Sequence, residues 1–363
     1  MKLAILMSSY KSFRTMRDEL ADCLLAAGNS LIFVGPFDGE EQHFVEKGCQ
    51  CINVPIQRRG TSLLADIKVL AAYRQILQQL QPEAVLTFSV KANTYGALMA
   101  RWLKIPRIIS ITGLGSGFMQ GGLLAQLLRA LYKPAFKGAA CVFFQNTANL
   151  AFMQKLGILK HGQRYRLISG SGVNLQRFQP TDYPADGEGI RFLFIGRVMR
   201  EKGIKELTEA FEQLYQRKPH IHLDILGLME EDYTDKIKQL CSHLPISYHG
   251  QVEDVRLNIA ASHATVLPSY HEGMANALLE SAAMARPVIA SRVPGCIETF
   301  DEGVSGLGCA PRDAQSLTEA MSAFLNLSHN QRVQMGLAGR TKMEREFNRQ
   351  KVIDAYLQEI DNI

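Results

Sequence analysis

Short runs of apolar residues recur along the first half of the chain, separated by longer amphipathic segments. A short, continuous apolar run is typical of a strand buried on both faces of a parallel sheet. Such runs lie at residues 2–7, 31–34, 51–54, 84–88, 107–111 and 140–144. Helices are predicted between them at residues 13–27, 63–80, 93–103 and 123–136. This alternation predicts a doubly wound, parallel α/β sheet.

The same alternation begins again near residue 190. Strands are predicted at residues 190–195, 221–226, 246–249, 264–267 and 288–290, and helices at 203–215, 232–240 and 273–284. A polar stretch at residues 169–184 separates the two patterns. We therefore predict an α/β protein of two Rossmann-like domains, residues 1–175 and residues 176–345. An amphipathic segment at residues 347–360 predicts one more helix after the second sheet.

The composition is that of a globular protein, with 47% hydrophobic and 21% charged residues. The apolar stretch behind the first two residues is shorter than that of a signal peptide. No run approaches the roughly 20 apolar residues that a bilayer span needs. Seven cysteines are scattered without a metal-binding spacing, so we expect reduced thiols. These features predict a cytoplasmic protein.

The net charge of +5 is divided unevenly. Residues 1–180 hold 21 Lys and Arg against 9 Asp and Glu, a net +12, and residues 181–363 hold 19 against 26, a net −7. A basic first half suggests contact with an anionic surface, such as nucleic acid, anionic lipid or a phosphate-bearing substrate. The alternative is a surface charge that varies between domains without a function.

Cationic side chains gather in the turn that follows the predicted strand 190–195. Gly196 would let a ligand approach the backbone closely. Arg197 and Lys202 could converge on the phosphates of one ligand, since ligands of such sheets bind beyond the carboxyl ends of the strands. The spacing is not that of a P-loop. The alternative is a solvated turn with ordinary ion pairs.

A second group of polar residues follows the predicted strand 264–267. Glu272 comes just before the predicted helix 273–284, and Glu280 lies within it. The backbone N–H groups of the first helical residues would attract phosphate. These residues are Gly273, Met274, Ala275 and Asn276. A carboxylate at position 280 costs free energy on an apolar helix unless it has a partner. The alternatives are that Glu272 only interacts favourably with the helix dipole and that Glu280 lies on a solvated face of the helix.

Taken together, these two groups resemble the retaining glycosyltransferases of family 4. The resemblance rests on Gly196-Arg197 with Glu201-Lys202-Gly203, and on the Glu-x7-Glu spacing of Glu272 and Glu280. The segments 170–178, 267–274 and 285–298 look like further parts of the same family pattern. The segments 111–118 and 144–146 are similar to a bacterial subgroup that builds capsule, O-antigen and lipid-linked oligosaccharides.

The resemblance implies the GT-B fold, with two Rossmann-like domains facing each other across a cleft and a final helix, about 346–363, returning to the first domain. It also implies catalytic roles for Arg197 and Lys202 at the donor diphosphate and for Glu272 at the donor sugar. Glu280 would bind the ribose. No metal and no cofactor is implied. The segment around His249, Gly250 and Val252 would meet the base.

On the acceptor side, the resemblance directs attention to Asn146 and to a glycine-containing loop with Gly113 and Gly115. This loop lacks the third glycine of a dinucleotide-binding fingerprint. It could line the acceptor side of the cleft, or its glycines could serve only a turn that needs positive φ. The subgroup often has Pro-Arg where Ala275-Asn276 stands here, so the donor sugar is left open.

A basic row marks the predicted helix 123–136 and the residue that follows it. Arg129, Lys133 and Lys137 are spaced four residues apart along an apolar segment, which suits an anionic bilayer surface. The alternative is a core-packed helix with one solvated edge. The charge of the first half favours membrane contact, and the sequence lacks the interleaved basic and aromatic residues of a nucleic-acid surface.

The resemblance, together with the basic first half, implies a retaining glycosyltransferase that moves sugar from a UDP-sugar to a polyprenyl-diphosphate-linked saccharide. Such an enzyme would work peripherally on the inner face of the cytoplasmic membrane, in surface polysaccharide assembly. Two alternatives are a nucleotide-sugar epimerase or hydrolase of the same fold and a non-catalytic nucleotide-sugar binding module. An epimerase would not need a basic, partly apolar first domain.

Overall fold

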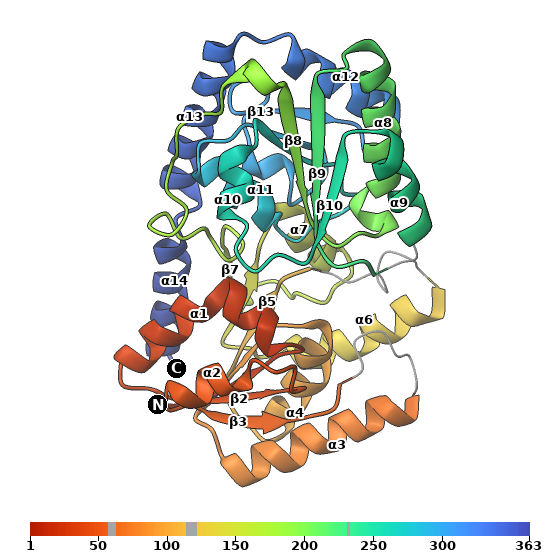
Figure 1. Ribbon diagram of the computed structural model, residues 1–363. Coiled ribbons are helices and arrows are strands. Elements are labelled where there is room, and N and C mark those ends of the chain that lie inside the picture. Colours follow the sequence, from red (N-terminus) through yellow and green to blue (C-terminus); the bar gives the residue numbers. More distant parts are fainter. Residues whose placement is uncertain (57–62, 114–121, 231–232) are drawn as a thin grey trace. The chain divides into compact units, whose positions relative to one another are not determined.

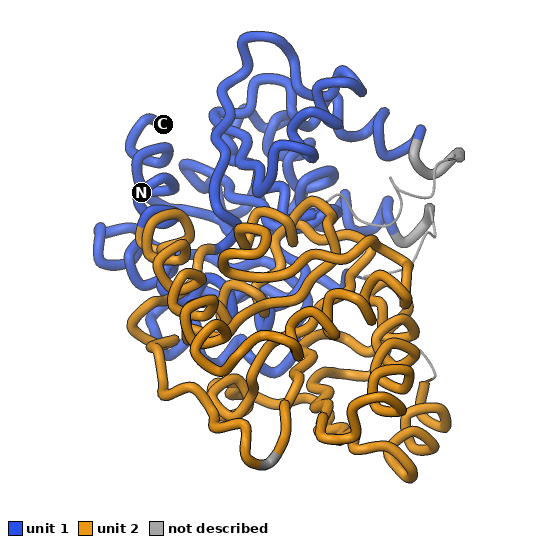
Figure 2. The backbone as a smooth tube through the Cα atoms, turned by 90° about the horizontal axis from the view of Figure 1, so that it is seen from above, with its two compact units in different colours: residues 1–171, 351–363 blue, residues 172–350 orange. Residues whose placement is uncertain are grey.

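The computed structural model describes residues 1–56, 63–113, 122–230 and 233–363, which form two compact units (Figure 1). Unit 1 contains residues 1–171 and 351–363, and unit 2 contains residues 172–350 (Figure 2). Each unit is built on its own parallel sheet. The predicted pair of Rossmann-like sheets is therefore confirmed.

The described strands of unit 1 form a seven-stranded sheet in the order β3-β2-β1-β4-β5-β6-β7. They are β1 (Lys2–Leu6), β2 (Ser30–Gly35), β3 (Gln50–Asn53), β4 (Ala84–Thr87), β5 (Arg107–Ile111), β6 (Cys141–Phe144) and β7 (Tyr165–Leu167). Its helices are α1 (Tyr10–Ala26), α2 (Glu41–Glu46), α3 (Leu63–Leu80), α4 (Ala97–Trp102), α6 (Gly122–Phe136) and α7 (Thr147–Lys155), with a π-helix at Ala92–Gly96. The order 3-2-1-4-5 is that of a Rossmann sheet.

The central strand β1 shows why the apolar runs are continuous. Leu3 and Ile5 pack on one face of the sheet in a core that includes residues of α1. Ala4 and Leu6 pack on the other face in a core that includes residues of α3 and α4. Both faces are covered, so the apolar positions on either side of the strand are buried.

The described strands of unit 2 form a six-stranded parallel sheet in the order β10-β9-β8-β11-β12-β13. They are β8 (Ile190–Ile195), β9 (Ile221–Leu226), β10 (Ile246–Gly250), β11 (Ala264–Leu267), β12 (Val288–Ser291) and β13 (Gly306–Cys309). Its helices are α8 (Ile204–Arg217), α9 (Thr234–His243), α10 (Arg256–Ala261), α11 (Asn276–Ala283), α12 (Ala314–Leu325) and α13 (His329–Glu346). The strand order repeats that of unit 1.

The last helix, α14 (Arg349–Asp361), packs into the core of unit 1. Val352, Ile353 and Tyr356 join the apolar cluster on the sheet face that also receives α1. The hydroxyl of Tyr356 lies 2.7 Å from that of Ser110 on β5. The chain therefore returns to its first sheet after completing the second.

The chain segments that leave and re-enter unit 1 meet within unit 2. The N–H of Val173 donates to the carbonyl of Phe347 at 2.8 Å, and the N–H of Arg349 donates to the carbonyl of Val173 at 3.1 Å. Gly172 has φ +64°, and a Cβ there would lie 2.5 Å from Cα of Arg349. Only glycine fits this crossing without displacing backbone.

Within the described ranges, no helix combines the length and the apolar character needed to cross a bilayer.

Candidate active site

The two polar segments singled out in unit 2 follow neighbouring strands. β8 pairs with β11 in parallel, so the turn after Ile195 and the loop after Leu267 leave the sheet at the same edge. The two segments touch through their backbones. Gly203 has φ +71°, and a Cβ there would lie 2.1 Å from the carbonyl oxygen of Pro268. This glycine therefore lets the turn and the loop approach each other closely.

Lys202 and Glu272, two of the three predicted catalytic residues, form an ion pair across these segments. The Lys202 Nζ donates to Oε1 of Glu272, and the hydroxyl of Ser269 donates to the same oxygen at 2.7 Å. Only 18% of the Lys202 side chain and 12% of the Glu272 side chain are exposed. A pair held in such partial burial interacts more strongly than one in bulk water.

Arg197, the third predicted catalytic residue, has a different carboxylate partner. Its guanidinium donates to both oxygens of Glu230 at 2.8 and 2.9 Å, and half of the Arg197 side chain is exposed. The structure thus pairs the two cations with separate carboxylates. An ordinary ion pair was the alternative interpretation of this turn, and the role of Arg197 at a phosphate stays a prediction.

The backbone of Gly196 lies close to the backbone of Gly227. The N–H of Gly196 donates to the carbonyl of Leu226 at 2.9 Å. A Cβ on Gly227, whose φ is +143°, would lie 1.8 Å from the carbonyl oxygen of Gly196. The turn after β8 is therefore packed directly against the turn after β9.

The helix after Glu272 begins later than the sequence predicts. α11 starts at Asn276 rather than at residue 273, so Glu272 lies in a loop ahead of the helix. The N–H of Ala275 donates to the carbonyl of Gly295 at 2.8 Å, and that of Asn276 donates to Met274 at 3.1 Å. The prediction of unoccupied N–H groups is therefore wrong for Ala275 and Asn276.

The turn after β12 explains this later start. Gly295 has φ +84°, and a Cβ there would lie 2.6 Å from the carbonyl oxygen of Glu272. The N–H of Glu272 donates to the carbonyl oxygen of Pro294 at 3.4 Å. This turn therefore holds Glu272 in the loop, with Gly273 next to it and Met274 buried. The sequence pattern cannot reveal such a contact between distant turns.

Glu280 lies on α11 among buried neighbours, and its own side chain is partly buried. Burial raises the pKa of Glu280 to about 7, while the guanidinium groups of Arg349 and Arg177 oppose this shift. The carboxylate therefore has cations near it, as its place on an apolar helix led us to expect.

The edge strand β10 carries the segment predicted to meet the base. Nε2 of His249 lies 2.7 Å from Oδ1 of Asp224, whose other oxygen accepts from Arg191 at 2.9 Å. The carbonyl of Gly250 accepts from the N–H of Gly227 at 2.7 Å. This bond links the end of β10 to the turn after β9, and Val252 follows in the next loop, half-buried.

In unit 1, the side chain of Asn146 caps helix α7. It accepts from the N–H of Asn149 at 2.8 Å and is buried. Gly113 lies two residues beyond the end of β5. Gly115 lies outside the described residues, as does most of the loop predicted with it.

Helix α6 buries one side and exposes the basic row. Tyr132 and Phe136 are buried in the core of unit 1. Arg129, Lys133 and Lys137 are all exposed. Arg129 also donates to the carbonyl of Leu156 at 3.0 Å. Both interpretations of this helix are compatible with the arrangement, because a core-packed helix with a solvated edge still presents that edge to a membrane.

Several site residues were not singled out from the sequence. Ser269 and Tyr270 lie inside the quoted motif without a periodic signal, and Glu230 lies on a loop after another strand. Burial lowers the pKa of His271, which directly precedes Glu272 in the chain. A motif records residue types in order, and the pairing of Arg197 with Glu230 depends on strand order.

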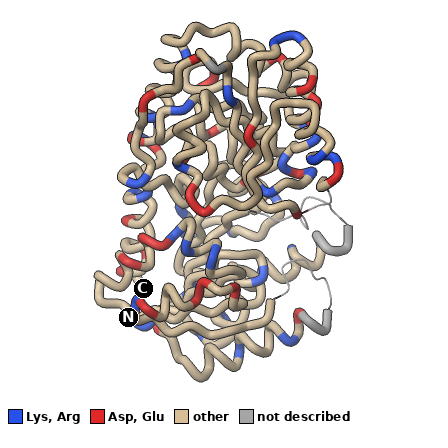
Figure 3. Tube along the Cα trace, viewed as in Figure 1, with Lys and Arg blue, Asp and Glu red and all other residues tan. Residues whose placement is uncertain are grey.

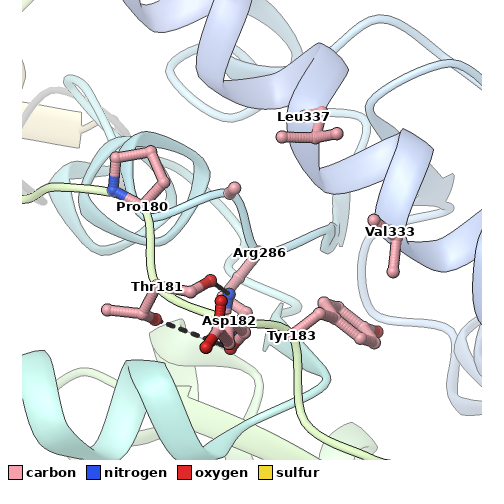
Figure 4. A pocket seen from close by; sticks show the side chains of 8 residues that line it. Pro180, Thr181, Asp182, Tyr183, Arg286, Val333 and Leu337 are labelled. Carbon is pink, nitrogen blue, oxygen red and sulfur yellow. Dashed lines mark hydrogen bonds between the residues drawn. The ribbon is translucent and has the colours of Figure 1, made fainter.

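A cavity of about 620 Å³ in unit 2 lies away from these residues (Figure 4). It is lined by residues 180–183, by Ala285 and Arg286 just before β12, and by Val333 and Leu337 of α13. Fully buried Arg286 donates to carbonyls of the 180–183 segment and of Met284, which follows α11, and burial lowers the pKa of Arg286 to about 10. Arg286 therefore holds the segment 180–183 against the rest of unit 2, at the amino ends of its strands.

The chain thus folds into two Rossmann-like units, each built on a parallel sheet, with a cation–carboxylate pair at the carboxyl edge of the second sheet. Residues 14–167 match the family described as Glycosyl transferase 4-like domain, and residues 189–327 match Glycosyl transferases group 1. The chain belongs to these glycosyltransferases, and the predicted enzyme class is confirmed.

Curated relatives extend over the full chain. One is the N,N'-diacetylbacillosaminyl-diphospho-undecaprenol alpha-1,3-N-acetylgalactosaminyltransferase of Campylobacter jejuni, which is 24% identical over 100% of this chain and 99% of its own. The capsular polysaccharide biosynthesis glycosyltransferase CapM of Staphylococcus aureus is 24% identical over 96% of this chain and 94% of its own.

Solved structures share the fold. Sucrose-phosphate synthase from Thermosynechococcus elongatus superposes with a TM-score of 0.81 at 19% identity, covering 100% of this chain and 99% of its own. HepE of Anabaena, in complex with UDP and glucose, has a TM-score of 0.80 at 16% identity and full coverage of both chains. These likenesses confirm the GT-B fold.

Proposed function

We propose that this glycosyltransferase moves a sugar, with retention of its anomeric configuration, from a UDP-sugar to a polyprenyl-diphosphate-linked saccharide in surface polysaccharide assembly. The observation that carries the proposal is the partly buried Lys202–Glu272 pair at the carboxyl edge of the second sheet. Full-length relatives name the pathway class: one acts on a diphospho-undecaprenol-linked sugar, and another serves capsular polysaccharide biosynthesis.

The donor side of the proposal divides the ligand among the residues of unit 2. Lys202 and Arg197 would neutralise the diphosphate as it leaves, which is the electrostatic term that speeds such a reaction most. Glu272 would then exchange part of its contact with Lys202 for hydroxyls of the donor sugar. Glu280 would accept hydrogen bonds from both ribose hydroxyls, since a carboxylate has two acceptor oxygens.

The base and sugar would be held mainly by backbone. In this proposal the loop from His249 to Val252 lies against the base, and the segment from Gly273 to Asn276 lies against the donor sugar. Among the described residues, none beyond the two chain neighbours of Gly250 comes within 4 Å of the place where its Cβ would stand, so a flat ring could approach its backbone. HepE, which shares this fold, has been solved with UDP-glucose.

The acceptor side is assigned to unit 1 on charge. By unit, residues 1–171 and 351–363 carry 21 Lys and Arg against 12 Asp and Glu, and unit 2 carries 19 against 23. Basic and acidic positions are interspersed along the trace of each unit (Figure 3). A net +9 would attract a diphosphate-bearing lipid and an anionic membrane surface. Gly113 and Asn146 would face the acceptor.

A ligand screen tests the donor. UDP-glucose, UDP-galactose, UDP-N-acetylglucosamine and UDP-N-acetylgalactosamine are each added to the full chain during thermal unfolding. A ligand that binds only the folded state raises the Tm. We expect one UDP-sugar to raise it most and GDP-mannose to have little effect. No shift with any of the four would contradict a UDP-sugar donor.

The acceptor and the stereochemistry are then tested together. The selected UDP-sugar is incubated with a polyprenyl-diphosphate-linked monosaccharide, and the product is examined by NMR. We expect a lipid-linked disaccharide whose new bond keeps the anomeric configuration of the donor. Release of a free epimerised sugar would instead favour an epimerase, and an inverted linkage would overturn retention.

A further inference from the structure

Tyr270 ties the loop that carries Glu272 to the segment that carries Lys202. Its backbone N–H donates to the carbonyl of Glu201 at 2.9 Å. Its hydroxyl donates to Oε1 of Glu206, in the first turn of α8, at 2.7 Å. One residue therefore makes both a backbone bond and a side-chain bond across the two segments.

The hydroxyl bond lies in a partly buried environment. Glu206 is only 8% exposed, and its Oε2 has no hydrogen-bond partner within the described part of the chain. The guanidinium of Arg312 lies 4.8 Å from the centre of the Tyr270 ring. Burial and the Glu206 carboxylate raise the pKa of Tyr270 to about 12, with Arg200 opposing the shift, so the hydroxyl stays protonated and donates.

The position of Tyr270 in the chain links this bond to the ion pair. Ser269, on one side of it, donates to Oε1 of Glu272. Lys202, which follows Glu201, donates to that same oxygen. The contacts of Tyr270 and those of the ion pair therefore join the same two segments within a few residues of each other.

We propose that Tyr270 is a positioning residue for sugar transfer, which holds Glu272 and Lys202 at the separation that the transition state requires by anchoring the loop that carries Glu272 to Glu206 of α8. This inference rests on the function proposed above. Tyr270 itself would not touch the substrate. A displacement of about 1 Å at a reacting centre can lower a rate about 100-fold, so loss of one anchoring bond is measurable.

The first test separates kcat from KM. UDP release from the selected UDP-sugar is measured for the wild type and for Tyr270→Phe, with the lipid-linked acceptor and with water alone. We expect kcat to fall about tenfold or more, and KM for the UDP-sugar to change less than about threefold, because the bulk of the nucleotide is held elsewhere.

Glu206 variants and a matched tyrosine serve as comparisons. Glu206→Gln keeps an acceptor oxygen for the hydroxyl and should retain most of kcat, whereas Glu206→Ala should fall with Tyr270→Phe. Tyr183→Phe removes a hydroxyl that also donates to a partner, the carbonyl of His263 at 2.7 Å, under another arginine. Because this tyrosine lies at the amino ends of the strands, its loss should leave kcat unchanged.

A double-mutant cycle shows whether Tyr270 acts through the ion pair. If it does, Tyr270→Phe should add little to the loss already caused by Lys202→Ala. Wild-type kcat in Tyr270→Phe, or two losses that multiply, would overturn the positioning role alone. A wild type that releases no UDP would overturn the proposed function and this inference with it. Should Tyr270→Phe fail to fold, the comparison of Glu206→Gln with Glu206→Ala decides: equal kcat values contradict the proposal.

Discussion

Oε1 of Glu272 accepts from both Lys202 and Ser269, so one carboxylate oxygen is the meeting point of the two site segments. A charge-assisted bond of this kind is stronger than a neutral one. Removing one partner leaves the other charge partly buried and unpaired, which costs more than the bond itself contributed. Substitutions at these residues should therefore lower stability as well as slow the chemistry.

Lys202→Ala and Glu280→Gln should each lose most sugar transfer while the fold survives. Lys202→Ala removes a cation that would stabilise the leaving diphosphate, and we expect kcat/KM to fall about 100-fold or more. Glu280→Gln weakens the proposed grip on the ribose and should act mainly through KM. Steady-state kinetics and circular dichroism measure both effects.

Lys205→Ala is the matched control for Lys202→Ala. The Lys205 side chain is exposed and lies 3.9 Å from Glu209 one helical turn away, a pair worth little. Its kinetics should equal those of the wild type. Wild-type turnover in both Lys202→Ala and Glu280→Gln would contradict the assignment of the donor site.

Glu280 should also make stability depend on pH. Its pKa is raised to about 7 in the folded chain, so the native state binds more protons than the unfolded state above the ordinary carboxyl pKa. The folded state is therefore penalised progressively as the pH rises toward 7. Glu280→Gln removes this penalty, and the free energy of unfolding of the variant should gain about 3 kcal/mol on the wild type between pH 4.5 and pH 8. Urea unfolding at several pH values measures this difference, and a constant difference across the range would contradict the shifted pKa.

At the scale of elements, sequence patterns predict the strands well and the loops poorly. Buried parallel strands leave continuous apolar runs such as residues 190–195, where β8 is found. β13 was not predicted, because Gly306 and Gly308 interrupt its apolar character. The start of α11 was misplaced because the turn at Gly295 takes up the N–H of Ala275. Contacts between turns depend on strand order, which periodicity does not contain.

Gly203→Ala should disrupt the junction between the two site segments. The φ of +71° is unfavourable for alanine, and its Cβ would lie 2.1 Å from the carbonyl oxygen of Pro268. We expect the free energy of unfolding to fall by about 2 kcal/mol or more, together with a loss of transfer. Thermal unfolding and UDP release measure these two effects.

Gly303→Ala provides the comparison for strain without a clash. Gly303 has φ +72°, and no atom of the described residues beyond its chain neighbours lies within 4 Å of the position that a Cβ would occupy. This variant should lose only about 1 kcal/mol, which is the cost of the backbone conformation. Equal losses in the two variants would show that contact with Pro268 is unimportant.

At the scale of the whole molecule, the net charges of +9 and −4 on the two units give each a separate task in our proposal. The sequence predicted this asymmetry, although α14 returns three acidic residues to the basic unit and reduces it from +12. The pairing partners within each unit, such as Glu230 for Arg197, could not be predicted, because they depend on how strands far apart in the sequence are ordered.

Membrane contact by unit 1 can be measured with vesicles. The double variant Lys133→Glu/Lys137→Glu reverses two exposed charges on and beside α6 and should bind anionic phosphatidylglycerol vesicles at least about tenfold less, since each basic residue near such a surface contributes about 1 kcal/mol. Lys236→Glu/Lys238→Glu makes the same charge change at exposed positions of unit 2. Equal loss in both variants would show a general charge effect and contradict docking through α6.

Transfer of labelled sugar is the most direct measurement of the central claim. The full chain is incubated with a radiolabelled UDP-sugar and a polyprenyl-diphosphate-linked monosaccharide, and label is followed into the lipid phase. We predict label in a lipid-linked disaccharide with the wild type and a loss of about 100-fold with Lys202→Ala. A wild type that leaves the label in the UDP-sugar, or transfer that is unchanged in Lys202→Ala, would contradict the account.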